Sequence, residues 1–94
     1  MDLVWTTSAR TALLEAVAYI ADDSPSAARR VMDDIERAAS ELKKLPMIGR
    51  PGRVEGTREL VVPQTQYILA YRVAVGAIVI LHVLHSAQRW PDSF

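Results

Sequence analysis

Residues 57–85 read TRELVVPQTQYILAYRVAVGAIVILHVLH, and this stretch determines the fold class. Three strand-like runs cover residues 57–62, 67–75 and 77–85, and the last two are rich in β-branched and aromatic side chains. The segment 63–66 and the region around Gly76 are typical turns, short enough to join consecutive strands as antiparallel hairpins. The stretch therefore predicts a three-stranded antiparallel meander.

The residues before this stretch predict two helices. Apolar side chains recur at positions 9, 12, 13, 16, 17 and 20, the spacing of one helical face, so we expect a helix over about 8–22. Ser24 and Pro25 are typical of the start of a second helix, which runs to about Leu45 before Pro46 stops it. Because the connection is very short, the helices should form an antiparallel hairpin. Their apolar stripe should lie mostly in the core, through Leu13, Val17, Val31 and Ile35.

Residues 2–5 and 47–56 complete the expected architecture. The first segment alternates enough to be a short strand, which would pair at one edge of the sheet. The second is rich in glycine and proline and is expected to be a loop. Segregated strands and helices imply an α+β fold in a single domain over residues 1–94, with the helical hairpin covering one face of one sheet. The other face would stay partly open for binding.

Composition excludes several classes of protein. The chain has no cysteine, which rules out disulfides, thiol catalysis and cysteine-bound zinc. Its net charge is zero, and a small arginine excess in residues 49–94 is far from the strongly basic face of a nucleic-acid-binding protein. The uncharged stretch 73–88 is interrupted by Gly76 and contains two histidines, so it indicates strands and no membrane span. The N-terminus lacks the features of a signal peptide, and we expect a cytoplasmic protein.

The two histidines are not expected to form a metal site. His82 and His85 are an odd number of residues apart, which directs their side chains to opposite faces of an extended strand. No third ligand of the usual kind lies nearby, and a glycine-rich phosphate loop is missing, so we expect neither a metal nor a cofactor. His82 is interpreted as a packed strand residue, whereas His85 ends its strand and is a candidate for a functional site.

Arg58 and Arg72 are the only positive charges within the meander. Alternation puts Arg72 on the face opposite to Leu69 and Tyr71, whose bulk should lie under the helices. On that open face Arg72 would be available to a carboxylate, a phosphate or a target protein, while a solvated or cross-strand-paired arginine explains it equally well. Trp90 either anchors the C-terminal tail on the core or is an interface hot spot.

Several motifs occur together in an order typical of one family. The two most distinctive are Tyr67-Ile68-Leu69-Ala70-Tyr71-Arg72-Val73 and Ile80-Leu81-His82-Val83-Leu84-His85-Ser86-Ala87-Gln88-Arg89-Trp90-Pro91. They follow Trp5-Thr6, Pro25-Ser26-Ala27-Ala28, Leu45-Pro46, Gly49-Arg50-Pro51-Gly52 and Gly56-Thr57-Arg58-Glu59-Leu60. Over residues 3–91 the chain thus resembles the RelE/ParE toxins of type II toxin–antitoxin systems.

This resemblance implies a fold, a partner and two alternative activities. The fold would be a small α+β domain like that of microbial ribonucleases. A cognate antitoxin would wrap around the helical hairpin and the sheet and neutralise the toxin, and operator DNA would be reached only through the antitoxin. Released relatives inhibit growth either by cleaving mRNA within the ribosome, as RelE-like members do, or by inhibiting DNA gyrase, as ParE-like members do.

The residues favour the ParE-like activity. RelE-like nucleases place several Lys or Arg side chains and a His, Tyr or Glu on the open sheet face. One family arginine normally follows the aromatic residue that begins the third strand, and here that position is Ile68, while a second basic position corresponds roughly to Leu60. As a nuclease, the alternative, the chain would retain His85 as acid or base, with Arg58, Arg72 and Arg89 for the phosphate. We expect instead a binding inhibitor without catalytic residues, whose candidate contacts with antitoxin or target are Arg58, Arg72, His85, Arg89 and Trp90.

Overall fold

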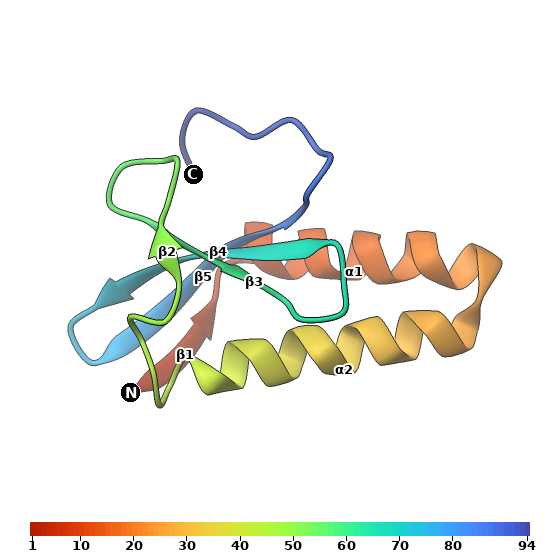
Figure 1. The fold of residues 1–94 in the computed structure, drawn as a ribbon, viewed down its shortest axis with the longest axis horizontal. Helices are drawn as coiled ribbons and strands as arrows, with labels where there is room; N and C mark the ends of the chain where they lie inside the picture. The colour runs from red at the N-terminus through yellow and green to blue at the C-terminus, as the bar shows by residue number, and fades with distance from the viewer.

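The computed structural model describes residues 1–94 as two helices and a five-stranded sheet. In chain order the elements are β1 (Asp2–Trp5), α1 (Thr7–Asp23), α2 (Pro25–Glu41), β2 (Arg50–Pro51), β3 (Arg58–Val61), β4 (Tyr67–Ala74) and β5 (Ala77–His85) (Figure 1). The predicted α+β class, helical hairpin and three-stranded meander are confirmed. Neither helix combines the length and the apolar composition that a membrane span needs.

The sheet contains one more strand than predicted and is mixed. Its strand order is β1-β5-β4-β3-β2, in which the meander is antiparallel as expected. The first strand lies at an edge, as predicted, but it pairs with β5 in parallel. The expected loop 47–56 contains the additional strand β2, where Arg50 and Pro51 pair with Glu59 and Arg58. Two residues are too few to show an alternating pattern, which explains why the sequence did not predict this strand.

Side-chain hydrogen bonds cap the N-termini of both helices. The Thr6 hydroxyl accepts a hydrogen bond from the Ala9 N–H, and the Ser24 hydroxyl accepts one from the Ala27 N–H. Helix α2 ends at Glu41, so the predicted end near Leu45 was wrong. Residues 42–44 form a turn in which backbone N–H groups bond three residues back. This tighter turn ends the helix before Pro46, whose ring disfavours a helical conformation at the preceding residue.

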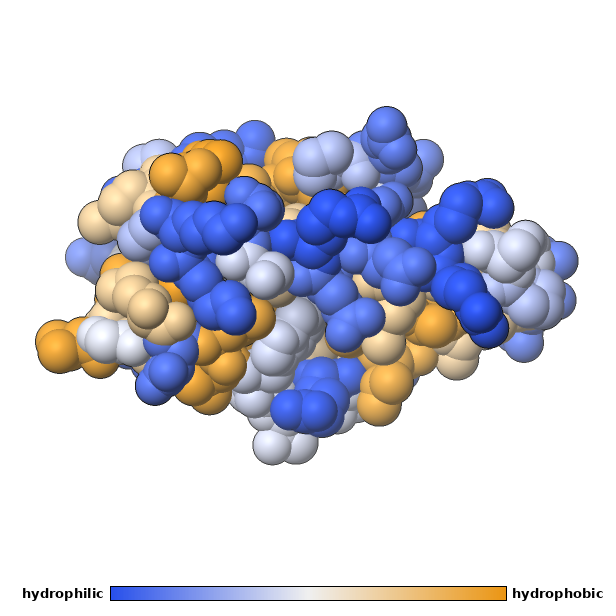
Figure 2. Space-filling model, turned by 90° about the horizontal axis from the view of Figure 1, so that it is seen from below, coloured by the Kyte–Doolittle hydropathy of each residue, from blue (hydrophilic) through white to orange (hydrophobic).

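The two helices pack on one face of the sheet and enclose the core (Figure 1). Leu13 and Ile35 are buried between the helices and the strands, and Val17 and Val31 pack against the same cluster. Leu69 and Tyr71 of β4 are fully buried in this core, which confirms the predicted alternation. The outer surface of α2 is mostly hydrophilic, as Figure 2 shows from below.

The opposite sheet face is more covered than expected. Ala70 pairs with His82 on this face, and the ring centroids of His82 and Phe94 are 5.9 Å apart, so the C-terminal tail lies over the strands (Figure 1). Ile68 and Ala70 are buried. Arg72, the next residue of β4 on this side, is exposed. This face is therefore open at Arg72, near the β4–β5 turn.

Candidate functional site

The two predicted arginines of the meander lie on opposite faces of the sheet. Arg72 pairs with Val79 on the face away from the helices and forms no ion pair. Arg58 pairs with Tyr71 on the helix side, where its Nη1 donates to the carbonyl oxygen of Gly49 at 2.8 Å. Arg72 is thus free to meet a ligand, whereas Arg58 holds the loop that precedes β2.

His85 lies at the end of β5, across from Tyr67, and its ring meets the Tyr67 ring edge-on at 5.3 Å between centroids. Its Nδ1 accepts a hydrogen bond from the Ala87 N–H at 3.1 Å. Because Nδ1 is the acceptor, the neutral ring carries its proton on Nε2. His85 and His82 face opposite sides of the sheet, as the sequence predicted.

Arg72 and His85 are also far apart along the hairpin. Val79, the partner of Arg72, lies six residues before His85 on β5, which is about 20 Å on an extended strand. The two side chains face opposite sides of the sheet. They therefore do not meet at one phosphate group.

Arg89 and Trp90 lie in the C-terminal tail. Arg89 is exposed and forms no ion pair. Trp90 is half-buried, and the guanidinium carbon of Arg53 lies 3.9 Å from the centre of its ring. The tail is thereby fastened to the loop that precedes β3, which supports the interpretation of Trp90 as an anchor.

Glu59 is at the centre of a polar cluster that the sequence did not predict. Its side chain is only 1% exposed, and it forms ion pairs with Arg50 at 3.0 Å and Arg53 at 3.7 Å. The Arg53 N–H also donates to Glu59 Oε2 at 2.7 Å. Alternation on β3 could have placed Glu59 opposite to Arg58, but nothing in the sequence indicated that the 50–57 loop folds back onto it. The cluster joins β2, β3 and, through Arg53, the Trp90 tail.

We expect Glu59→Gln to lower the free energy of unfolding by about 2 kcal/mol, because the amide cannot neutralise two guanidinium groups. Urea denaturation would measure this loss, and tryptophan emission should shift as Trp90 loses its contact with Arg53. Glu55→Gln, which changes an exposed carboxylate of the same loop, is the matched control. Equal stability of the two variants would show that the cluster does not hold the loop.

Tyr71 has a structural role that is visible in its hydrogen bonds. Its hydroxyl donates to the carbonyl oxygen of Pro46 at 2.8 Å and accepts from the Gly49 N–H at 2.9 Å. Burial raises the pKa of this phenol above its ordinary value of 10.0, so it stays protonated at neutral pH. The side chain is fully buried and fastens the segment after α2 to β4.

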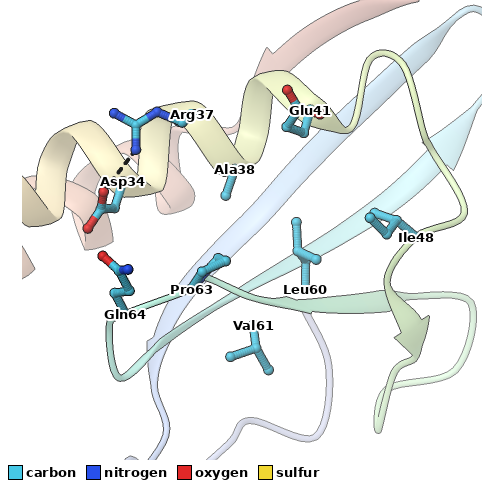
Figure 3. A pocket seen from close by; sticks show the side chains of 9 residues that line it. All are labelled: Asp34, Arg37, Ala38, Glu41, Ile48, Leu60, Val61, Pro63 and Gln64. Atoms are coloured by element: carbon cyan, nitrogen blue, oxygen red, sulfur yellow. Dashed lines mark hydrogen bonds and ion pairs between the residues drawn. The ribbon is translucent and has the colours of Figure 1, made fainter.

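A groove lies between α2 and β3. It encloses about 310 Å³ and is lined by side chains of α2, of Ile48 and of the β3 region (Figure 3). Ala38 points into it from α2, Leu60 points into it from β3, and an ion pair of 3.0 Å between Arg37 and Asp34 lies on its rim (Figure 3). Ile48 and Val61 are 53% and 50% exposed. The groove therefore has an apolar floor and charged edges.

The outer edge of β3 is only partly paired. Strand β2 covers Arg58 and Glu59, whereas Leu60 and Val61 have no strand on that side. An unpaired strand edge can accept an extended segment of another chain through backbone hydrogen bonds. Together with the groove, this edge is suited to binding a peptide, and the structure contains no group of three potential metal ligands.

The chain matches known toxins in sequence and in structure. Residues 3–90 match the family described as the ParE toxin of the type II toxin–antitoxin system parDE. A putative toxin, Y4kP, of Sinorhizobium fredii is 45% identical and covers 94% of this chain and 91% of its own length. Toxin RelE2 of Caulobacter vibrioides is 34% identical, over 93% of this chain and 97% of its own.

Two solved structures share the fold over nearly the whole chain. The chromosomal ParDE toxin–antitoxin system from P. aeruginosa superimposes with a TM-score of 0.73 at 27% identity, covering 90% of this chain and 95% of the other. The toxin–antitoxin complex RelBE2 from Mycobacterium tuberculosis gives 0.64 at 28% identity, covering 89% and 95%. The sequence match, the shared fold and the arrangement of the five strands agree, and the chain belongs to the ParE toxin family, within the RelE/ParE toxins of type II toxin–antitoxin systems.

Proposed function

We propose that this chain is a growth-inhibiting toxin that acts in the cytoplasm by binding and inhibiting DNA gyrase. The observation that carries this proposal is the separation of Arg72 from His85, which lie on opposite sheet faces and at opposite ends of the β4–β5 hairpin. Cleavage of RNA needs an acid or base and a cation at the same phosphate. A protein that acts by binding has no such requirement.

We further propose that a cognate antitoxin neutralises the toxin by placing an extended segment in the groove between α2 and β3. The groove offers apolar side chains to the segment, and the free edge of β3 at Leu60 and Val61 offers backbone hydrogen bonds. Both solved relatives come from toxin–antitoxin systems, which supports a partner of this kind.

Purified toxin is expected to stop gyrase from supercoiling relaxed plasmid DNA, and its induction in cells should cause filamentation and a DNA-damage response. Arg72→Glu should weaken the inhibition at least about tenfold, because a repulsive charge replaces the unpaired Arg72 guanidinium on the open face. Arg10→Glu, an exposed change on α1, is the control and should inhibit like the wild type. Unchanged supercoiling in the presence of excess folded toxin would contradict the proposal.

A ribosome-dependent mRNA endoribonuclease is the second candidate. One observation favours it: His85 Nδ1 accepts the Ala87 N–H, which leaves Nε2 as the ring nitrogen that could exchange a proton with RNA, and the unpaired Arg89 follows four residues later. Primer extension on mRNA from induced cells tests this activity. Cuts at codon-specific positions that disappear in His85→Ala would establish the nuclease in place of the gyrase inhibitor.

A further inference from the structure

A second cleft lies between α1 and the end of β5. It encloses about 390 Å³ and shares no residue with the groove between α2 and β3. One face of α1 lines it with Ala12, Glu15, Ala16 and Tyr19, and the other wall comes from the β4 and β5 strands and the tail, with Tyr67, His82, Val83, His85 and Gln88.

The shape of this cleft follows from the spacing on α1. Residues three and four apart lie on the same side of a helix, so Glu15 and Tyr19 are neighbours while the two alanines leave room beside the sheet. Tyr67 forms the opposite wall, held edge-on against His85. Tyr19 and Tyr67 line the same cleft, and burial and, second, the Tyr19 phenol raise the pKa of Tyr67. Two tyrosines and a carboxylate therefore surround one space.

The charges of the side chains that line the cleft indicate which kind of ligand it can bind. Glu15 is exposed and forms no ion pair, and no Lys or Arg side chain lines the cleft. The faces of tyrosine rings carry negative electrostatic potential and attract cations. A nucleic acid is a poor occupant, because its phosphates would meet Glu15 and no compensating positive charge.

We propose that this cleft binds the guanidinium group of an arginine side chain in the toxin-binding segment of the antitoxin. The flat guanidinium would stack on the Tyr19 or Tyr67 ring and donate two hydrogen bonds to the Glu15 carboxylate, an arrangement that the compact ammonium of lysine cannot reproduce. The surroundings are complementary to a basic segment, because α1 carries three acidic side chains, Glu15, Asp22 and Asp23, against Arg10 alone. The assignment of the partner as an antitoxin rests on the function proposed above. The preference of the cleft for a guanidinium group does not depend on that function.

N-acetyl-arginine-N-methylamide is the probe for this site. Titrated into the isolated toxin, it should shift the backbone amide NMR signals of residues 12–19 and 85–88, and the citrulline analogue, which has the same shape without the charge, should not. Glu15→Gln should weaken the binding about tenfold through loss of a charge-assisted contact. Tyr19→Ala, a change at a side chain that is 77% exposed, should weaken it about threefold.

Two controls separate the cleft from the rest of the helical surface. Glu36→Gln removes an exposed, unpaired carboxylate of α2, and Leu14→Ala removes a side chain that is 57% exposed on α1 outside the cleft. Both variants should bind the probe like the wild type. Equal binding of the citrulline analogue, or shifts that map elsewhere, would overturn the proposal.

The complex with the antitoxin tests the assigned occupant. When the antitoxin is bound, the probe should no longer reach the cleft. Adding the probe to the complex should therefore leave the backbone amide NMR signals of residues 12–19 unchanged. An antitoxin that binds and leaves the cleft open to the probe would overturn this inference alone. A co-encoded protein that neither binds the toxin nor restores growth would contradict the proposed function instead.

Discussion

Gly49→Ala is expected to lower the free energy of unfolding by about 3 kcal/mol, one of the two largest effects that the structure predicts. A Cβ atom at this position would lie 2.6 Å from Tyr71 Oη, 2.7 Å from Tyr71 Cε1 and 2.8 Å from the backbone oxygen of Glu59. Neither neighbour can move easily, because Tyr71 is fully buried and Glu59 belongs to the paired part of β3. Thermal and urea unfolding would measure the loss.

Gly56→Ala is the matched control for this prediction. Gly56 has a φ of 79° and no atom within 4 Å of an added Cβ. Its replacement should cost only about 1 kcal/mol, the penalty for an L-residue in the left-handed region. A smaller loss in Gly49→Ala than in Gly56→Ala would show that the segment at Gly49 can shift away from Tyr71 and that the contact is not rigid.

The close contact at Gly49 also matters for the groove. Gly49 follows Ile48 directly, and its N–H and carbonyl groups are held by Tyr71 and Arg58. These two hydrogen bonds keep Ile48 beside Leu60 in the groove wall. A variant that displaces Gly49 should therefore bind the antitoxin less well even where it remains folded.

Alternation along β4 predicted the two faces of that strand correctly. Tyr71 and Leu69 lie under the helices and Arg72 faces the other way, because side-chain direction in a strand depends only on parity. The resemblance to the RelE/ParE toxins is likewise confirmed by the family match and the shared fold. The direction of a side chain on a strand depends on a local pattern, and the family resemblance depends on the whole sequence, so both could be predicted without the structure.

The candidate site was less predictable, because it depends on contacts between distant segments. The sequence placed Arg50 and Arg53 in a loop and could not show that this loop folds onto Glu59 or that Arg53 meets Trp90. Nor does parity tell how far Arg72 lies from His85, since that distance is set by the register of β4 on β5. The groove depends on α2 passing over the end of β3, which no local pattern encodes.

The double variant Ile48→Asp, Val61→Asp is expected to weaken antitoxin binding more than about 100-fold. Both side chains are about half exposed and apolar; Ile48 lies in the wall of the groove between α2 and β3, and Val61 lies at the free edge of β3 beside it, so the free toxin should keep its fold. In the complex, each introduced carboxylate would be buried beneath the antitoxin segment without a partner, at a cost of several kcal/mol. Calorimetry on the purified proteins would measure the change in affinity. In cells, the variant should inhibit growth in spite of co-expressed antitoxin.

Val75→Asp is the control for this variant. Val75 is the most exposed large hydrophobic residue and lies at the tip of the β4–β5 turn, at the left of Figure 1. Val61 pairs with Ile68 near the start of β4, whereas Val75 follows the end of that strand, so the two valines are a strand length apart. A new charge there should leave antitoxin binding unchanged, because the tip lies at the far end of the strands from the groove. If the double variant is folded and the antitoxin still binds it as it binds Val75→Asp, the antitoxin segment does not lie in the groove. The free edge of β3 would then have to be protected in another way.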